Sequence, residues 1–328
     1  MSEGGAVRWG ILSTARINDK LLAGARAAAG VEVVAVGSRD RARGDAFAAE
    51  HGIGRVHGSY EELLADPDVE AVYIPLPNSL HVPWSIRALE AGKHVLCEKP
   101  LTRRAVEAEA AFDAADRAGR LLMEAFMWRY HPQTEAIVRL AAEIAPLRVV
   151  RAAFGFPMPP EDVSNVRLQG SLEGGALMDV GCYCVSALRL LGGEPERVQG
   201  EFVEGGDGVD VRFAGVVRFA GDVLGTFDCG FDVPNRSGIE IVGDGGTVTS
   251  YDPWHGVAPR LTLARPDEAP EEVPVEAANP YQLELEDLSA AIRSGGAPRL
   301  GRADAVGQAR AIEALYAAAD TGRAVAVG

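Results

Sequence analysis

The chain has 328 residues, of which 47% are hydrophobic and 24% are charged, and its formal net charge at pH 7 is −15. This length is comfortable for two domains, and the composition is that of a globular protein able to bury hydrophobic cores. The excess of negative charge argues against a nucleic-acid partner and against binding to an anionic membrane surface.

The N-terminus and the cysteines bear on the cellular compartment. Met1–Gly5 lacks the basic start and apolar core of a signal peptide, and no apolar run approaches the ~20 residues that a membrane helix needs. The four cysteines have neither the spacing of a disulfide framework nor that of a zinc site. We therefore expect a cytoplasmic protein with reduced thiols, no metal site and no membrane association.

Residues 1–124 alternate strand-like and helix-like segments. This alternation is typical of a doubly wound parallel sheet of the Rossmann type. Ser59 with Glu62 predicts a capping box that opens a short helix, and Gly92 predicts the end of another helix. The expected strands are Val7–Leu12, Val31–Val36, Arg55–Val56, Val69–Ile74, His94–Cys97 and Leu121–Glu124. The other expected helices are Ile17–Ala29, Arg41–His51, Ser79–Ala91 and Thr102–Ala118.

Residues 125–328 have a different texture and predict a second, α+β domain. Stretches rich in β-formers alternate with Gly-rich turns, which indicates a largely antiparallel sheet with helices on one face. The expected strands are Leu147–Phe156, Arg197–Val203, Val209–Phe219, Val223–Cys229, Ile239–Val242, Thr247–Ser250 and Arg260–Leu263. The expected helices are Gln133–Ile144, Ala176–Leu191, Tyr281–Ser294 and Arg302–Ala319.

The first strand-to-helix turn is where a dinucleotide-binding fold holds pyrophosphate on backbone N–H groups. The glycine positions of the usual fingerprint are occupied here by Ser13, Ala15 and Asn18, which are small or tolerant of turns. By itself this is a weak motif, since any strand–turn–helix unit could have it, but it opens a βαβ unit. The predicted cofactor contacts of this turn are Ser13, Thr14, Ala15, Arg16 and Ile17.

The end of the second strand predicts the choice of cofactor. NAD enzymes usually place an acid there for the ribose hydroxyls, whereas this chain has Ser38 and Arg39. A guanidinium can bind a 2′-phosphate by charge-assisted hydrogen bonds, and Arg43 can add charge one helical turn later. We therefore expect NADP, with NAD possible. The alternative is a solvated arginine beside Asp40 as an ordinary helix cap.

Three further segments combine polar residues with predicted strand or helix ends. Each has a plain structural alternative: a lysine after a strand is usually a surface charge, and an Asp and a Tyr four apart usually share a packed helix face. Strand ends of a doubly wound sheet, however, open onto its ligand crevice. The segments are Ile74–His81, Cys97–Pro100 (with Glu98-Lys99-Pro100) and Gly174–Tyr183 (with Asp179-x-Gly181-x-Tyr183).

In this order the three segments resemble the Gfo/Idh/MocA oxidoreductases over essentially the whole chain. Glu98–Pro100 matches the most specific signature of that family, and Asp179–Tyr183 matches its D-x-G-x-H or D-x-G-x-Y motif. Within the family, the chain is most similar to the branch of dimeric dihydrodiol dehydrogenases and NADP-dependent aldose (xylose) dehydrogenases. The segments that carry this similarity are Arg8–Ser13, Leu122–Pro132 and Asp179–Tyr183. Tyr183 stands where many relatives have His, which argues against an inositol dehydrogenase.

The resemblance implies a Rossmann domain followed by an open-faced β-sheet domain that often forms the subunit interface, and hence a homodimer or homotetramer. It implies a catalytic Lys99 with Asp179 and Tyr183 facing the substrate. The further cofactor contacts that it implies are Leu76, Pro77, Asn78, His81, Glu98, Lys99, Trp128 and Arg129.

The chemistry of hydride transfer explains why such residues are needed. When a hydride passes between an alcohol carbon and the nicotinamide, a proton must leave the alcohol. A tyrosine with a pKa near 10 is a poor base at neutral pH, but a neighbouring ammonium lowers that pKa. Lys99 could act in this way on Tyr183 or could hold the substrate oxygen itself, while Asp179 could orient a polyol. The sequence leaves open which group takes the proton.

The expected function is therefore hydride transfer between NAD(P) and a hydroxyl of a sugar, polyol or cyclic diol. A reductase of a keto sugar or sugar nucleotide would use the same residues in the opposite direction. A non-catalytic sensor that binds the dinucleotide would be favoured by loss of Lys99 or Asp179, and both are present. A glycosidase that uses NAD transiently would retain its cofactor tightly and release sugar without net reduction.

Overall fold

The computed structural model describes residues 5–159, 162 and 164–328, and the chain forms two compact units. The first unit contains the chain up to Thr102 together with Val106–Met127 and Asn279–Val306. The second contains Arg103–Ala105, Trp128–Ala278 and Gly307–Gly328. Residues 1–4, on which the expectation of no signal peptide partly depends, lie outside the described residues.

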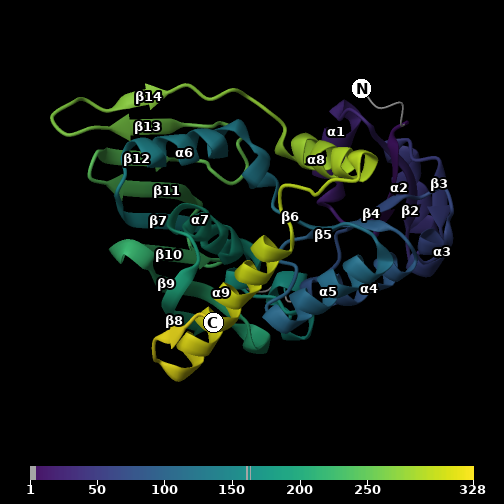
Figure 1. The fold of residues 1–328 in the computed structure, drawn as a ribbon. Coiled ribbons are helices and arrows are strands. Elements are labelled where there is room, and N and C mark those ends of the chain that lie inside the picture. Colours follow the sequence, from purple (N-terminus) through teal and green to yellow (C-terminus); the bar gives the residue numbers. More distant parts are fainter. Residues whose placement is uncertain (1–4, 160–161, 163) are drawn as a thin grey trace. The chain divides into compact units, whose positions relative to one another are not determined.

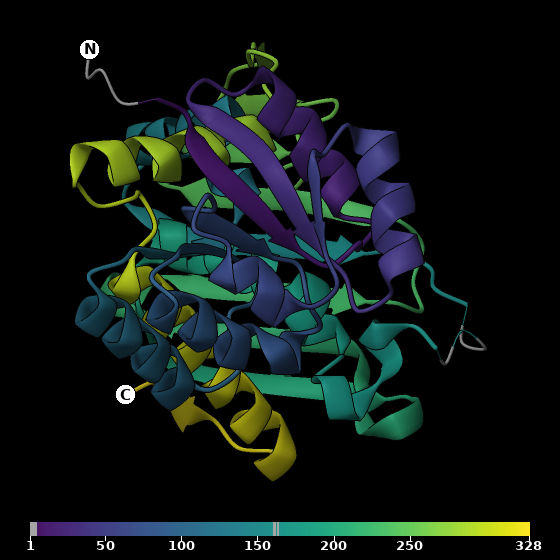
Figure 2. The same cartoon turned by 90° about the vertical axis from the view of Figure 1, so that its right-hand side faces the viewer.

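The first unit is built on a six-stranded parallel sheet in the order β3-β2-β1-β4-β5-β6 (Figures 1 and 2). This confirms the predicted Rossmann-type sheet, whose chain order reverses between β1 and β4. The strands are β1 (Val7–Leu12), β2 (Val31–Gly37), β3 (Arg55–His57), β4 (Ala71–Ile74), β5 (His94–Glu98) and β6 (Leu122–Ala125). The helices are α1 (Asn18–Ala27), α2 (Arg41–His51), α3 (Tyr60–Ala65), α4 (His81–Glu90), α5 (Ala105–Ala118) and α8 (Pro280–Ser294).

Successive residues of β1 show why both faces of this sheet are buried. Gly10 packs against the Leu63 side chain of α3, while the indole of Trp9, on the opposite face, donates to Ser289 Oγ of α8 at 3.2 Å. The predicted cap at Ser59 is also present, since Ser59 Oγ accepts from the Glu62 backbone N–H at 3.0 Å. The Glu62 carboxylate accepts from the backbone N–H of Gly58 at 2.8 Å, one residue before the position expected for a capping box.

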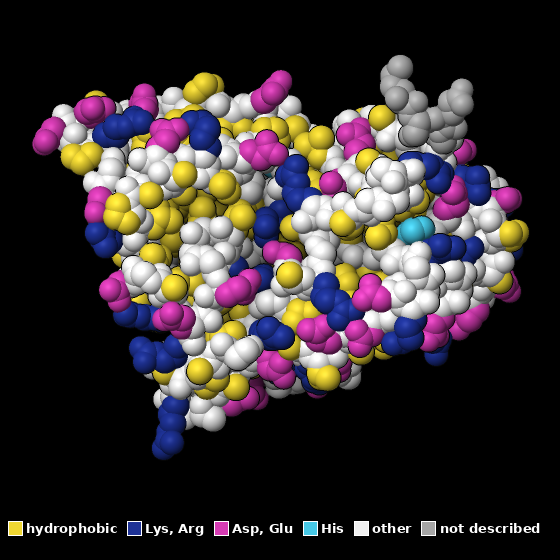
Figure 3. All heavy atoms as spheres, in the orientation of Figure 1, with side chains coloured by type: hydrophobic (Ala, Val, Ile, Leu, Met, Phe, Trp, Pro, Cys, Tyr) yellow, Lys and Arg dark blue, Asp and Glu magenta, His cyan; other side chains and the backbone are white. Residues whose placement is uncertain are grey.

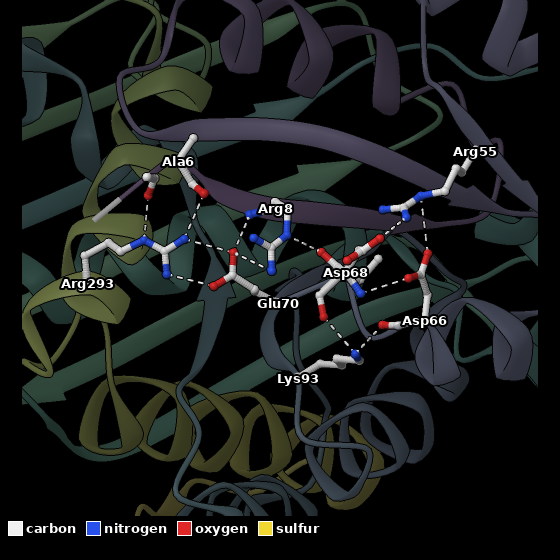
Figure 4. A network of polar contacts seen from close by, with 10 residues as sticks. Ala6, Arg8, Arg55, Asp66, Asp68, Glu70, Lys93 and Arg293 are labelled. Atoms are coloured by element: carbon white, nitrogen blue, oxygen red, sulfur yellow. Dashed lines mark hydrogen bonds and ion pairs between the residues drawn. The ribbon is translucent and has the colours of Figure 1, made fainter. Parts of the chain in front are cut away.

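The amino-terminal ends of the strands are joined by a network of ion pairs (Figure 4). Glu70, which precedes β4, accepts two hydrogen bonds from the Arg293 guanidinium at 2.8 and 2.9 Å and a third from the Arg8 backbone N–H at 3.0 Å. Nearby, Lys93 Nζ donates to the carbonyl oxygens of Asp66 and Val69, both at 2.7 Å. Because ligands of such sheets bind at the carboxyl ends of the strands, this network stabilises the edge opposite the expected ligand site.

Replacing Glu70 with glutamine is expected to destabilise the protein by about 1–3 kcal/mol at pH 7, because half-buried donors of Arg293 and Arg8 lose an ionised acceptor. Hydrogen bonds from Arg293 lower the pKa of Glu70 from 4.5 to about 2. A lowered pKa in the folded state gives stability that is present above pH 4.5 and is lost as the pH falls towards 2.

The measurement is the difference in unfolding midpoint between wild type and Glu70→Gln at pH 7 and again between pH 4.5 and pH 3. The difference should shrink over the acidic range. Glu272→Gln, which removes an exposed partner of Arg260, is the matched control and should change the midpoint little. A Glu70→Gln protein as stable as wild type at pH 7 would contradict the assignment.

The second unit is built on a nine-stranded, mostly antiparallel sheet in the order β14-β13-β12-β11-β7-β10-β9-β8-β15. Within it only the pairing of β7 with β10 is parallel among the described strands. The strands are β7 (Leu147–Gly155), β8 (Pro195–Glu204), β9 (Asp210–Phe219), β10 (Leu224–Gly230), β11 (Arg236–Gly243), β12 (Gly246–Ser250), β13 (Leu261–Ala264), β14 (Glu271–Val273) and β15 (Val325–Ala326). The fold of this unit matches the predicted α+β domain.

Helices cover one face of this sheet and leave the other open. α7 (Cys182–Gly192) packs on β7 and β10, and α6 (Pro132–Glu143) packs on β12 and β13 (Figure 1). A broad hollow of about 970 Å³ follows a face of the same sheet across β7–β12. Its lining includes Ala214, Val216 and Thr226, flanked by the charged pair Arg236 and Asp228 at 2.6 Å.

The helix that precedes α7 is not a plain α-helix. Leu177–Gly181 forms a π-helical turn, η5, which continues directly into α7. By length and composition the stretch Gly170–Gly192 could cross a membrane, but 83% of its most apolar window is buried within the protein, as in the core helix of a globular domain. The short 3₁₀ segments are η1 (Asn78–Leu80), η2 (Met127–Tyr130), η3 (Val166–Leu168), η4 (Gly170–Leu172), η6 (Gly206–Gly208) and η7 (Ala220–Asp222).

The last two helices show how the chain connects the units. α8 packs on α1 and β1 and so belongs to the first unit, although the sequence analysis placed it in a domain of residues 125–328. α9 (Arg302–Thr321) begins in the first unit, where Arg302 pairs with Glu109 at 2.7 Å, and ends in the second. On the face seen in Figure 3, side chains of both charges are interspersed, so the net charge of −15 forms no single acidic patch there.

Candidate functional site

The β1–α1 turn has the backbone of a pyrophosphate-binding loop. Ser13, at the first fingerprint position, has a φ of 108°, a conformation that glycine favours. Its carbonyl accepts from the Asn18 side-chain amide at 2.9 Å. Ser13 Oγ and Asn18 Oδ1 are buried without a hydrogen-bond partner among the described residues. Of these two atoms the Ser13 hydroxyl can donate to a phosphate oxygen, so this tight turn fits a bound phosphate, whereas Asn18 Oδ1 can only accept from a donor such as a hydroxyl group.

The rest of this turn leads into α1, whose N-cap residue is Ile17. Within the described chain, no side chain caps the N-terminus of this helix. Backbone N–H groups at a helix start can bind an anion, but those of Asn18, Asp19 and Lys20 donate here to carbonyl oxygens of the turn at 3.0, 3.3 and 3.1 Å. Arg16 is exposed, and the Thr14 carbonyl accepts from Arg43 at 3.2 Å. The predicted contacts Ser13, Thr14, Ala15, Arg16 and Ile17 therefore lie on one turn.

The end of β2 places two guanidinium groups where a 2′-phosphate would bind. Arg39 and Arg43 are exposed, and Ser38 is buried with its hydroxyl bonded to the Asp40 carbonyl at 2.7 Å. Asp40 Oδ1 accepts from the Arg43 backbone N–H at 3.1 Å and so caps α2. This is the ordinary helix cap that the alternative interpretation of this segment expects. Burial raises the pKa of the Tyr60 hydroxyl, while Arg39 and Arg43 beside it lower that pKa. The charge at this strand end fits NADP.

The loop that carries Lys99 is held by buried side chains from the neighbouring strands. Tyr73 of β4 donates to Glu98 Oε1, and Glu98 Oε2 accepts from the Lys99 N–H at 3.3 Å. Glu124 of β6, which is buried, accepts from the Leu101 N–H at 2.7 Å. The backbone on both sides of Lys99 is therefore fixed at the carboxyl end of β5.

His81 connects this loop to the Leu76–Asn78 turn after β4. Its ring is 1% exposed, with Nε2 2.7 Å from the Leu76 carbonyl and Nδ1 2.8 Å from the Pro100 carbonyl. Burial lowers the pKa of His81 to about 4, although the two carbonyl oxygens favour the protonated ring. Because both ring nitrogens face backbone carbonyls, this ring links the Leu76, Pro77 and Asn78 turn to Pro100. A direct contact between His81 and the cofactor stays a prediction.

In the second unit, Asp179 lies on the π-helical turn and pairs with Arg167, with Nε and Oδ2 2.6 Å apart. The Arg167 side chain is 42% exposed and that of Asp179 is 15% exposed. From the sequence we expected a carboxylate that accepts hydrogen bonds from a polyol. The structure adds the guanidinium donors of Arg167 beside it, so the pair can both donate to and accept from hydroxyl groups.

Tyr183, one turn after Asp179, belongs to an aromatic cluster. Its ring lies 5.4 Å from Phe154 and 5.8 Å from Trp254, and Trp254 lies 5.5 Å from Trp128. Tyr183 is 7% exposed and Trp128 is fully buried. These rings pack around the tyrosine and fix the direction of its ring.

The two remaining predicted residues lie in the same unit. Arg129 donates to Ser186 Oγ on α7 at 3.4 Å, and its guanidinium lies 5.8 Å from the Trp128 ring. In this conformation Trp128 supports the cluster of Tyr183, and contact of Trp128 or Arg129 with the nicotinamide stays a prediction.

The structure thus brings the predicted residues together in two groups, one in each unit. The first comprises the β1–α1 turn, Ser38, Arg39, Leu76–Asn78, His81, Glu98 and Lys99. The second comprises Trp128, Arg129, Asp179 and Tyr183. Sequence reasoning missed Arg167, Phe154 and Trp254. For Arg167 the only hint in the sequence is a basic residue 12 positions before Asp179, and that spacing alone does not predict an ion pair.

Comparison with known proteins identifies the class. Residues 7–126 match the model of the oxidoreductase family with an NAD-binding Rossmann fold, and residues 139–249 match the Gfo/Idh/MocA C-terminal domain. The chain therefore belongs to the Gfo/Idh/MocA family of NAD(P)-binding oxidoreductases, as its motifs indicate.

Individual relatives fit the branch suggested by the sequence. The chain is 40% identical over 322 residues to D-xylose 1-dehydrogenase (NADP(+)) 2 of Haloferax volcanii, covering 97% of this chain and 98% of that protein. It is 34% identical over 256 residues to the trans-1,2-dihydrobenzene-1,2-diol dehydrogenase of Bos taurus, with 76% and 75% covered. A 3-ketoreductase of Actinomadura kijaniata in complex with NADP and TDP-benzene shares the fold with a TM-score of 0.90 at 31% identity, covering 96% and 98%.

Proposed function

We propose that this oxidoreductase is an NADP-preferring dehydrogenase that acts on a hydroxyl group of a sugar, polyol or cyclic diol. The observation that carries the proposal is Lys99, an ammonium on a loop fixed by Tyr73, Glu124 and His81 at the carboxyl end of β5. The relatives named for D-xylose and for a dihydrodiol support the substrate class.

Each side chain has a chemical role in this proposal. When bound, the nicotinamide exchanges a hydride at C4 with the carbon that bears the hydroxyl. Lys99 stabilises negative charge on the substrate oxygen and favours the phenolate of Tyr183. Tyr183 is the candidate acceptor of the hydroxyl proton, and the Asp179–Arg167 pair orients neighbouring hydroxyl groups.

A keto-sugar reductase is the second candidate. It is favoured by the similarity to the 3-ketoreductase, which covers nearly the whole chain, and by 35% identity over 277 residues to dTDP-3,4-didehydro-2,6-dideoxy-alpha-D-glucose 3-reductase of Streptomyces violaceoruber. The same groups would then deliver the proton to the carbonyl oxygen.

A substrate panel tests both candidates. Aldoses, polyols and cyclic diols are offered with NADP and with NAD, and dTDP-linked keto sugars with the reduced cofactors, while the absorbance of reduced nicotinamide is followed. Turnover of a hydroxyl substrate would support the dehydrogenase, and turnover of only the keto sugars would support the reductase. Tight dinucleotide binding without any turnover would favour the non-catalytic sensor.

Replacing Arg39 with alanine is expected to raise the dissociation constant of NADP by at least about tenfold and to leave that of NAD nearly unchanged. The reason is that it removes a charge-assisted contact with the 2′-phosphate. Fluorescence titration with both cofactors measures this, and Arg41→Ala, which removes a neighbouring exposed guanidinium paired with Asp45, is the control. Equal losses for both cofactors, or a wild type that prefers NAD, would refute the NADP assignment.

The quaternary state and location belong to the same proposal. We propose a homodimer or homotetramer formed through the open face of the second sheet, where Ala214, Val216 and Thr226 line the hollow. Light scattering at several protein concentrations measures the mass. We also propose a cytoplasmic location, which cell fractionation tests.

A further inference from the structure

The helix that carries Asp179 and Tyr183 is tied at its start to a buried carboxylate. Asp210, the first residue of β9, is 3% exposed, and its Oδ2 accepts from the Leu177 backbone N–H at 2.6 Å. Leu177 is the first residue of the π-helical turn, two positions before Asp179. A carboxylate at this place satisfies a backbone donor and interacts favourably with the helix dipole.

The second oxygen of Asp210 is held from another element. Oδ1 accepts from the Tyr316 hydroxyl of α9 at 2.7 Å, and the guanidinium of Arg103 lies 4.1 Å from the centre of the Tyr316 ring. Phe213 packs on the same ring in a T-shaped arrangement, with centroids 5.9 Å apart. Asp210 is therefore immobilised by segments that lie far apart in the sequence.

The turn before the helix is shaped around this carboxylate. Gly175 has a φ of 117°, and a side chain there would collide with Asp210 Oδ1. From the other side, the Gly175 N–H donates to the Arg167 carbonyl at 2.9 Å, while the Arg167 guanidinium holds Asp179 at 2.6 Å. The turn is thus fixed between Asp210 on one side and Arg167, the partner of Asp179, on the other.

We propose that Asp210, with Tyr316, is a positioning residue for catalysis that sets the place of Asp179 and Tyr183 by anchoring the start of their helix. The catalytic consequence rests on the proposed function of those two side chains. A displacement of about 1 Å at a reacting group can cost about 10²-fold in rate, so an anchor at Leu177 can act on turnover without touching the substrate.

The charge of Asp210 makes the anchor depend on pH. Burial raises the pKa of Asp210 to about 6, although the Leu177 N–H, the Tyr316 hydroxyl and the Arg103 charge favour the ionised form. Among the described residues, the buried thiol of Cys229 also faces Asp210, and it stays neutral because burial raises its pKa. Below about pH 6 the acceptor for Leu177 is a neutral acid, which is a weaker acceptor than a carboxylate.

The test compares Asp210→Ala, Asp210→Asn and Tyr316→Phe with Asp222→Asn, an exposed change at the other end of β9, as the control. Hydrogen exchange followed by mass spectrometry should show faster exchange over residues 174–183 in the three variants and no change in the control. NADP dissociation constants should stay within about twofold of wild type, because the cofactor turn belongs to the first unit. For Asp210→Ala, kcat should fall by about 10–100-fold.

The remaining comparisons distinguish the loss of a positioning contact from a general loss of stability. Tyr316→Phe keeps the ring packing and should give a smaller loss of kcat, and it remains informative if Asp210→Ala does not fold. Below about pH 6 the wild-type kcat should fall further than the titration of Tyr183 alone would give, and this additional fall should be absent in Asp210→Asn. Unchanged exchange over residues 174–183 together with a normal kcat would overturn the proposal. If the wild type turns over none of the offered substrates, the proposed function fails, and the exchange measurement still decides whether Asp210 anchors the helix.

Discussion

A Lys99→Met protein is expected to bind NADP with nearly wild-type affinity and to lose at least about 10³-fold in kcat. The methionine keeps most of the length of the side chain but removes the ammonium, which stabilises charge on the substrate oxygen and assists proton transfer. The loop itself should persist, because its backbone is held by Tyr73, Glu124 and His81.

Lys20→Met is the matched control, since Lys20 is an exposed lysine on α1. It should keep its kcat, and both variants should show wild-type circular dichroism. Single-turnover kinetics with preformed complex separate chemistry from product release. A folded Lys99→Met protein with near-normal kcat would exclude the central role of this lysine.

The parallel sheet was predictable because its signals are local. Each buried strand is a short run of apolar residues bounded by turn signals, and β1, β2 and β5 end within one residue of the expected positions. β14 was not predicted, because Glu271, Glu272 and Val273 show no apolar alternation and the strand forms only by pairing with β13. The placement of α8 was also beyond the sequence, since an apolar helix face does not say which unit will cover it.

The site was predictable to the extent that strand ends determine it. Ser13, Ser38 and Lys99 follow β1, β2 and β5, so a parallel sheet brings their backbones to one edge. The positive φ of Ser13 could not be foreseen from a serine. Nor could the partners of Asp179, because the path of the chain from Arg167 to the helix, and the arrival of Asp210 and Tyr316 from β9 and α9, depend on tertiary packing.

Tyr183→Phe is expected to reduce kcat for alcohol oxidation by roughly 10²–10⁴, the usual range for removing a positioned acid or base. The phenylalanine ring can keep the contacts with Phe154 and Trp254, whose centroids lie 5.4 and 5.8 Å away, so the change removes the hydroxyl and little else. If Lys99 transfers the proton and Tyr183 only orients the substrate, the loss should be smaller and should lie partly in KM.

The pH dependence of the rate decides whether Tyr183 or Lys99 accepts the proton. A tyrosine whose pKa is lowered by the Lys99 ammonium must lose its proton before it can accept one from the alcohol, so the oxidation rate should rise with pH to a plateau. This rise should vanish in Tyr183→Phe, and in Lys99→Met it should move to higher pH, because the phenolate is then no longer favoured. Trp254→Phe, which perturbs the ring cluster but keeps the hydroxyl, should retain the rise. A rise that survives unchanged in Tyr183→Phe would exclude Tyr183 as the titrating base and would leave Lys99 as the group that accepts the proton.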